Sequence, residues 1–406
     1  MAPFRSIAQL GVLLAVMGAA LGPVPLGSPA PPHGASSAPG TPGASAAPGA
    51  SGTPDVPGAT NGRGAAMAGQ EQEDSRELAG RRIVLSYSGP TPPAGVLRTL
   101  REGRAAGVIF FGENVTGPEQ FAQAVADLRQ AAAEAPHPRT LLLMTDQEGG
   151  RIRRLPGAPE LSARRAGSAA DPVGTAAASG AGAARTLADA GLNLNLAPVL
   201  DVYDEPDNFI DHYERSYSQD PAEVAELGTA FLTTQQGLGV AATAKHFPGL
   251  GAAPRGGNTD ERPVTLDVPL SQLRARGEGP YRAAIAAGVR LVMASWAVYP
   301  ALDPDRPAGF SPAIIQGELR GRLGFGGVTV TDAMEAKALA AYGGTGDRAL
   351  AAARAGMDLL LCSARDPQQA EEATEALADA LDDGRLDRHG FAEAVARVDA
   401  LRGSLG

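Results

Sequence analysis

Several residue types that carry common protein chemistry are scarce in this chain. Its one cysteine, Cys362, excludes a disulfide within the chain, and its place after the mostly apolar run 357–361 predicts a buried core thiol. The five histidines lie in separate segments, and the sequence has no His-Glu-x-x-His motif. Walker loops and Gly-x-Ser-x-Gly elbows are also missing. The sequence therefore predicts neither a metal site nor any other cofactor.

Positive charge is scarce as well, and lysine is almost absent. The chain has 45 acidic residues against 35 lysines and arginines, and its formal net charge is −10. This balance excludes a nucleic-acid-binding protein that relies on a basic surface. Lys245 and Lys337 are the only lysines. Because arginine is used everywhere else, Lys245 indicates a position that requires a compact ammonium group, which arginine does not replace.

The first seventy residues differ from the rest in composition. Residues 1–22 contain one basic residue, Arg5, and then a short apolar run, which is typical of a secretory signal or an N-terminal anchor. The short apolar core favours export. Residues 23–70 are mostly Pro, Ala, Gly, Ser and Thr, a composition that predicts a disordered linker. We therefore expect a secreted or extracytoplasmic protein, with the N-terminus as the route to any membrane or cell-wall association; no oligomeric state is favoured.

Residues 71–406 alternate between apolar runs of strand length and alanine-rich segments of helical period. Such alternation, with nearly continuous apolar strands, indicates a parallel sheet covered by helices. Eight strands and no Gly-x-Gly-x-x-Gly after the first favour a single-domain α/β (β/α)8 TIM barrel over a doubly wound sheet. The strands are predicted to begin at residues 83, 107, 140, 192, 240, 289, 327 and 357, and the main helices to span 118–134, 172–190, 221–237, 271–288, 311–323, 338–356, 367–381 and 390–401.

Polar residues gather where these strands end. In a parallel barrel such ends meet at one mouth, so together they predict an active site there, although each alone could be a cap or a core residue. Asp332 could cap the following helix or act as a nucleophile. Trp296 could belong to the core or present its ring to a sugar. The residues concerned are Asn114, Asp146, Glu148, Arg151, Asp201, Lys245, His246, Trp296 and Asp332.

Five motifs in this order resemble glycoside hydrolase family 3, and most closely its single-domain bacterial β-N-acetylglucosaminidases. The resemblance runs from about Leu78 to Leu401 and implies a TIM barrel that removes terminal β-linked N-acetylglucosamine from cell-wall or chitin-type sugars. It also implies retention of configuration, no cofactor, and a carbohydrate that contains N-acetylglucosamine as the substrate. The motifs are Asp-Gln-Glu-Gly-Gly-Arg (146–151) with Arg154, Ala-Pro-Val-Leu-Asp (197–201), Glu-Arg-Ser-Tyr (214–217), Lys-His-Phe-Pro-Gly (245–249) and Val-Thr-Asp-Ala-Met (330–334).

The resemblance also implies roles for individual residues. Asp332 matches the nucleophile. The residues that match those holding the sugar hydroxyls carry charged or hydrogen-bonding side chains suited to that task. They are Asp146, Arg154, Arg215, Lys245 and His246, with Trp296 as a further sugar contact.

The loop after residue 249 departs from the family pattern. Asp260 aligns with the aspartate of the family's Asp-Ser-His, but Arg262 stands where the acid/base histidine is expected, and arginine cannot exchange a proton near neutral pH. Two hypotheses follow. In the preferred one, Asp260 or Glu261 serves as the acid/base of a working hexosaminidase. In the other, the protein is a secreted sugar-binding relative that has lost catalysis.

Overall fold

The structure, a computed structural model, describes residues 74–405. The predicted signal segment 1–22 and linker 23–70 lie outside this range and stay predictions. Among residues 74–405, none of the helices combines the length and apolar character needed to cross a bilayer.

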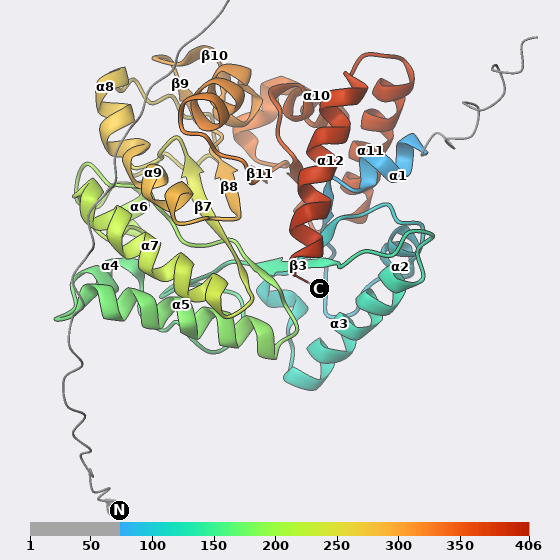
Figure 1. The fold of residues 1–406 in the computed structure, drawn as a ribbon, viewed down its shortest axis with the longest axis horizontal. Helices are drawn as coiled ribbons and strands as arrows, with labels where there is room; N and C mark the ends of the chain where they lie inside the picture. Colours follow the sequence, from blue (N-terminus) through green and yellow to red (C-terminus); the bar gives the residue numbers. More distant parts are fainter. Residues whose placement is uncertain (1–73, 406) are drawn as a thin grey trace, which may run out of the picture. The chain divides into compact units, whose positions relative to one another are not determined.

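Eight parallel strands close into a barrel, and helices pack around its outside (Figure 1). Around the barrel the strands follow the order β1-β12-β11-β8-β7-β6-β3-β2. Each begins within two residues of its predicted start, so the predicted TIM barrel is confirmed. The barrel strands are β1 (Ile83–Leu85), β2 (Gly107–Ile109), β3 (Leu142–Thr145), β6 (Leu194–Asn195), β7 (Ala241–Phe247), β8 (Leu291–Ala294), β11 (Val328–Ala333) and β12 (Leu359–Leu361).

The helices that follow the strands agree with the predicted periods, except that two segments are broken. Residues 338–356 were expected to form one helix, but Gly343 adopts φ 79° and separates η5 from α10. Residues 271–288 form three short pieces instead of one helix. The helices are α1 (Ser75–Gly80), α2 (Ala94–Arg101), η1 (Gly112–Asn114), α3 (Pro118–Ala133), α4 (Ala163–Gly167), α5 (Pro172–Asp189), α6 (Phe209–His212), α7 (Pro221–Gly237), α8 (Leu270–Gln272), η2 (Leu273–Gly277), α9 (Gly279–Ala286), η3 (Ala308–Phe310), η4 (Ala313–Arg322), η5 (Lys337–Tyr342), α10 (Thr345–Ala355), α11 (Pro367–Asp382) and α12 (Arg388–Gly403).

Two short hairpins were not predicted. β4 (Gln147–Gly149) pairs with β5 (Ile152–Arg153), and β9 (Val298–Tyr299) pairs with β10 (Asp303–Pro307). Both arise in segments that follow a barrel strand. Insertions of this kind enlarge the active face of a barrel and leave its frame unchanged.

Alternate strand residues point into the barrel and toward the helices, and each set forms its own core. Val84, Met144 and Val330 belong to the inner cluster, whereas Ile83 and Leu85 belong to the larger outer one. This alternation follows from the two-residue repeat of a strand. Cys362 is buried in the outer core, as predicted.

The two ends of the inner cluster differ. At the carboxyl ends of the strands, Ile109, Met293 and Leu361 form part of the floor of a cavity. In the same cluster Val398 and Leu401 of α12 pack against the barrel interior. The carboxyl end is therefore the open face, where parallel barrels place their chemistry.

Candidate active site

A cavity of about 540 Å³ opens at the carboxyl ends of the strands. Seven of the nine predicted site residues line it, although they come from five different segments of the chain. Glu261 and Trp296 are the two that do not. The seven are Asp146, Arg154, Arg215, Lys245, His246, Asp260 and Asp332.

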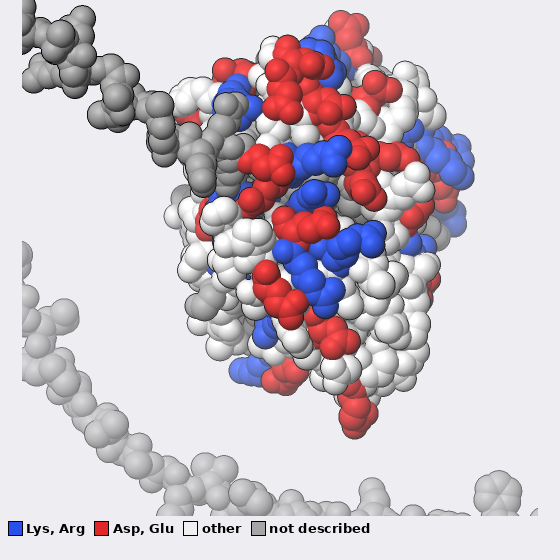
Figure 2. Space-filling model, turned by 90° about the vertical axis from the view of Figure 1, so that its right-hand side faces the viewer, with Lys and Arg blue, Asp and Glu red and all other residues white. Residues whose placement is uncertain are grey.

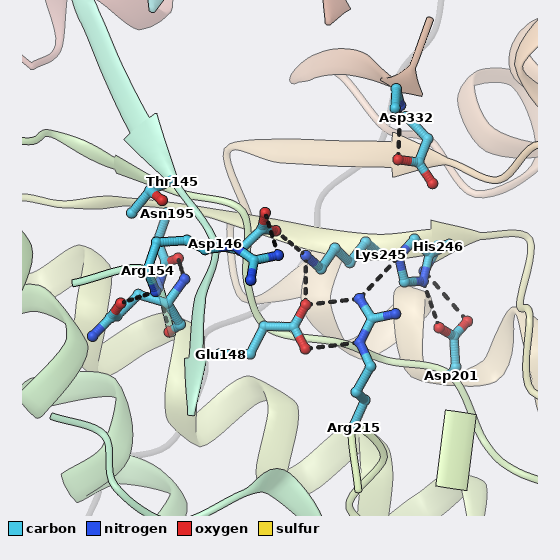
Figure 3. A network of polar contacts seen from close by, with 12 residues as sticks. Thr145, Asp146, Glu148, Arg154, Asn195, Asp201, Arg215, Lys245, His246 and Asp332 are labelled. Carbon is cyan, nitrogen blue, oxygen red and sulfur yellow. Dashed lines mark hydrogen bonds and ion pairs between the residues drawn. The ribbon is translucent and has the colours of Figure 1, made fainter. Parts of the chain in front are cut away.

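Lys245 forms the centre of one side of this cavity. Its Nζ lies 2.7 Å from Asp146 Oδ1 and 2.7 Å from Glu148 Oε1 (Figure 3). Arg215 donates two hydrogen bonds to Glu148, of 2.9 Å from Nε and 2.7 Å from Nη2. Arg154 lies 4.0 Å from Asp146. The lysine that the composition singled out therefore joins two carboxylates, and its side chain is only 2% exposed.

The charges in this network stabilise one another. Burial opposes the ionised form of Glu148, but Arg215 and Lys245 outweigh it and hold the pKa of this carboxyl well below its usual range. Burial likewise favours neutral Lys245, yet Asp146 and Glu148 raise its pKa above the ordinary value. These groups therefore keep their charges at any physiological pH, which suits side chains that hold neutral sugar hydroxyls.

Local backbone geometry brings this network together. The β4–β5 hairpin turns at Gly149, whose φ of 116° disfavours any other residue, and a Cβ there would lie 2.2 Å from the carbonyl oxygen of Leu161. The hairpin places Glu148 and Arg154 on the same wall of the cavity. Glu214, with φ 56°, holds a conformation that is costly for its residue type directly before Arg215. Strain next to a site residue is typical of functional segments.

His246 is oriented by a buried carboxylate. Its Nδ1 lies 2.7 Å from Asp201 Oδ2, and Asp201 Oδ1 accepts hydrogen bonds from the backbone nitrogens of Leu250 and His246. The other ring nitrogen, Nε2, lies 3.4 Å from Arg215 at the cavity. Asp201 therefore fixes the ring so that one edge faces the cavity, as carboxylates do for histidines in many active sites.

Asp332 stands apart from this network and extends its carboxylate toward it (Figure 3). It is the penultimate residue of strand β11, and its Oδ1 accepts a 2.8 Å hydrogen bond from the backbone nitrogen of Ala333. The next helix, η5, begins at Lys337 and has Ala336 at its N-cap position. The alternative that Asp332 caps a helix is therefore wrong, and its carboxylate is free to face the cavity.

Asp260 lies on the long loop after β7, which is docked against the segment that follows Asp332. The backbone nitrogens of Lys337 and Ala338 donate to the carbonyls of Asp260 and Thr259, at 3.1 Å each. These two backbone hydrogen bonds connect the two loops, which are distant in sequence. Asp260 is consequently held at the mouth of the same cavity as Asp332.

The environment of Asp260 is acidic. The residue as a whole is exposed at the mouth, yet desolvation of its carboxyl group and the negative charges of Asp332 and Glu335 raise the pKa of Asp260 to about 6. Arg215 and His246 act in the opposite direction. Such a carboxyl can hold a proton in mildly acidic solution and release it, which is what a general acid/base needs.

Two predicted site residues lie elsewhere. The side chain of Glu261 is 61% exposed, lies 4.0 Å from Arg262, and is not among the cavity residues. Trp296 is 1% exposed, packs against Phe310, and donates its indole hydrogen to the carbonyl of Ala333 at 2.8 Å. Its ring therefore supports the strand end that carries Asp332 and offers no face to a sugar. A contact between Trp296 and a sugar is therefore not compatible with its buried position.

The sequence did not predict a role for Glu335. It lines the cavity three residues after Asp332, and it accepts hydrogen bonds from Ser363 Oγ at 2.8 Å and from Gln369 Nε2 at 3.3 Å. Its position after a strand-end carboxylate was the available signal. Aromatic residues Phe111 and Tyr213 also line the cavity, together with Arg365 above Phe111. Within residues 74–405 no group of three metal-ligating side chains is present.

Comparison with known proteins agrees with this geometry. Residues 92–401 match the sequence profile described as "Glycosyl hydrolase family 3 N terminal domain". An uncharacterized secreted glycosyl hydrolase of Arthroderma benhamiae is 44% identical over 330 residues, which cover 80% of this chain and 93% of that one. A beta-hexosaminidase of Stenotrophomonas maltophilia is 34% identical over 73% of this chain and 86% of its own length.

Solved structures of similar enzymes have the same fold as this chain. A beta-N-acetylhexosaminidase from Beutenbergia cavernae superimposes with a TM-score of 0.73 at 34% identity, over 81% of this chain and 98% of that one. A family 3 beta-N-acetylglucosaminidase from Paenibacillus gives a TM-score of 0.77 at 34% identity, and here the match spans 62% of the longer enzyme. On the profile match and these identities, the chain belongs to glycosyl hydrolase family 3.

Proposed function

We propose that this protein is a retaining β-N-acetylhexosaminidase that removes terminal, non-reducing β-linked N-acetylglucosamine from cell-wall or chitin-type sugars. The observation that carries the proposal is that two unlike clusters of charged side chains line one cavity. One cluster is the paired network, in which Lys245 and Arg215 form ion pairs with Asp146 and Glu148. The other is the carboxylate cluster of Asp332, Asp260 and Glu335. The hexosaminidase names of relatives from Stenotrophomonas and Beutenbergia support the choice of sugar.

The chemistry follows from these positions. A carboxylate oxygen of Asp332 attacks the anomeric carbon while the carboxyl group of Asp260 gives its proton to the departing glycosidic oxygen. The sugar is then held as an ester of Asp332. Asp260, now ionised, takes a proton from a water molecule whose oxygen attacks the same carbon and releases Asp332. Two inversions at one carbon retain the configuration.

Asp260 is preferred to Glu261 as the acid/base because only Asp260 lines the cavity. Its raised pKa is also suited to the step, since a general acid must carry a proton at the working pH. The missing histidine is thereby replaced by a carboxyl group, which is the usual acid/base of glycosidases. Arg262 is exposed and takes no part in this scheme.

The paired network supplies binding. Lys245 and Arg154 can donate to sugar hydroxyls, Asp146 can accept from them, and His246 offers one ring nitrogen. These groups are held in place before a substrate arrives, which reduces the entropic cost of binding. The relative from Arthroderma is described as secreted, and this supports the predicted export segment at residues 1–22.

The test is turnover of an aryl N-acetyl-β-glucosaminide and of N,N′-diacetylchitobiose, with the first-formed anomer followed by nuclear magnetic resonance. We expect the β-anomer to appear first and a slow 2-fluoro substrate analogue to label Asp332, detected by mass spectrometry of peptides. Inversion, or a label elsewhere, would overturn the mechanism. Calorimetric binding of N-acetylglucosamine without any turnover would instead favour the sugar-binding hypothesis, to which the Arg262 substitution points.

A further inference from the structure

A second hollow of about 500 Å³ lies at the opposite end of the barrel from the active site. Two of its lining residues, Arg82 directly before β1 and Met357 two residues before β12, place this groove at the amino ends of the strands. Acidic and basic side chains are interspersed on the face of the molecule shown in Figure 2, so a local excess of one sign needs an explanation. The groove has such an excess, with five lining arginines: Arg82, Arg320, Arg354, Arg385 and Arg397.

Three of these arginines converge on Asp358, two on its carboxylate and one on its backbone carbonyl. Arg320 Nη2 lies 2.5 Å from Asp358 Oδ2, and Arg397 lies 3.0 Å from Asp358 Oδ1. Within residues 74–405 Arg82, which is 1% exposed, donates only to the backbone carbonyls of Asp358 and Met357, and it stacks on the ring of Phe391. A buried cation without a carboxylate of its own is costly. Burial accordingly lowers the pKa of Arg82 to about 10.

The remaining groups reduce the excess without cancelling it, because five arginines lie near three carboxylates, those of Asp358, Asp387 and Glu393. The side chain of Arg354 makes no ion pair or hydrogen bond with another of residues 74–405, and Arg385 lies 3.3 Å from Asp383 outside the groove. Two carboxylates also line the groove, and both have partners. Asp387 caps α12 through the backbone nitrogen of Gly390 at 2.7 Å, and Glu393 lies 3.3 Å from His389.

Two further features favour an anion. The first turn of α12 borders the groove, and the amino end of a helix attracts negative charge. Arg320 Nε is buried and has no hydrogen-bond partner among the described residues. Guanidinium groups match the geometry of phosphate oxygens in a forked arrangement.

We propose that the arginine groove, defined by the five arginines above, binds a phosphate group. The phosphate comes either from free inorganic phosphate or from a phosphodiester polymer. Because the groove lies at the far end of the barrel, it can be filled while the active site turns over substrate. For a hexosaminidase that is exported, a phosphodiester polymer in this groove would hold the enzyme close to the surface that carries its substrate.

Isothermal titration calorimetry on the full chain tests the proposal, with inorganic phosphate in one arm and poly(glycerol phosphate) in the other, at an ionic strength fixed with chloride. The variant is Arg354→Ala/Arg385→Ala, since both side chains are exposed and neither holds Asp358. The matched control, Arg98→Ala/Arg185→Ala, removes two exposed arginines from other helices.

We expect one saturable site, weakened about tenfold or more in the groove variant and unchanged in the control, because two charge-assisted contacts are lost. Arg154→Ala, which alters the active site, should leave the affinity for phosphate unchanged. Saturation by phosphate alone would assign the site to the free ion, and tighter binding of poly(glycerol phosphate) would assign it to the polymer. No saturable binding in either arm, or equal affinity in the groove variant and the control, would overturn the proposal. So would loss of binding with Arg154→Ala.

Discussion

The active-site cavity has two unlike sides. On the paired side, built from the ends of β3 and β7, each carboxylate lies against a basic side chain. On the carboxylate-rich side, built from β11 and the loop that carries Asp260, the carboxyl groups have other carboxyl groups as neighbours. Glu148 contacts Lys245 and Arg215, and its pKa falls. Asp260 is desolvated and feels the negative charges of Asp332 and Glu335, and its pKa rises. The paired side can therefore hold a sugar while its side chains keep their charges, and the carboxylate-rich side can exchange a proton.

The largest expected effect comes from removing the nucleophile on the carboxylate-rich side. Asp332→Asn should lower kcat by about 10⁴-fold or more, because the ester intermediate can no longer form. Binding of N-acetylglucosamine should survive, since the paired side is intact. Steady-state hydrolysis and calorimetry measure the two quantities. Asp305→Asn, an exposed carboxylate on β10, serves as the control, and hydrolysis by Asp332→Asn near the wild-type rate would contradict this division.

The next effect separates two neighbouring carboxylates. Asp260→Asn should lower kcat for N,N′-diacetylchitobiose by about 10²- to 10⁴-fold, and less for an activated aryl glycoside whose leaving group needs no proton. Glu261→Gln should leave both rates within about twofold, because this side chain is outside the cavity. Rates for both substrates with both variants are the measurement. The reverse result would transfer the acid/base role to Glu261.

Breaking the paired side should affect binding and stability together. Lys245→Met leaves Asp146 and Glu148 without their shared ammonium group, and loss of one partner of a buried ion pair costs about 3 to 5 kcal/mol in the free energy of unfolding. Denaturant unfolding and calorimetry with N-acetylglucosamine should show both losses. Lys337→Met is the matched control for unfolding alone, because the other lysine of the chain is exposed but lines the same cavity. If Lys245→Met binds sugar normally, the network does not hold the substrate.

The smallest expected effect concerns the tuning of Asp260. In the wild-type enzyme kcat/KM should fall as pH rises through about 6, where Asp260 loses its proton. Glu335→Gln removes a negative charge that raises this pKa, so the fall should move to lower pH by a fraction of a unit. The separate variant Glu335→Asp keeps the negative charge and should show the wild-type pH–rate profile. A pH–rate profile unchanged in Glu335→Gln would show that the cluster does not set the acid/base pKa.

Much of the fold could be predicted because it depends on local patterns. Apolar strand runs and alanine-rich helical periods recur eight times, and each requires burial against its neighbours, so all eight strand positions were confirmed. The broken helix at Gly343 was missed although Gly343, Gly344 and Gly346 mark a break in the sequence. The hairpin at β4–β5 was missed because two short polar strands have no clear alternation.

The candidate site was predictable as far as its residues follow strand ends. Lys245, His246 and Asp332 were identified in that way, and the structure places them around one cavity. Trp296 follows a strand end as well, yet its ring turns into the core and donates to the carbonyl of Ala333. The position of a residue in the sequence specifies how close it lies to the carboxyl end of its strand, but packing determines the direction of its side chain.

The sequence by itself determined the barrel, the family and the rare lysine, because periodicity, motifs and composition are properties of the chain. Only the tertiary structure decided between Asp260 and Glu261, since adjacent residues on a loop differ in direction and not in sequence signal. It also placed Glu335 in the same cavity as Asp260 and collected five arginines at the opposite end of the barrel. Electrostatic interaction depends on distance in space, and residues far apart along the chain become neighbours only when the barrel closes.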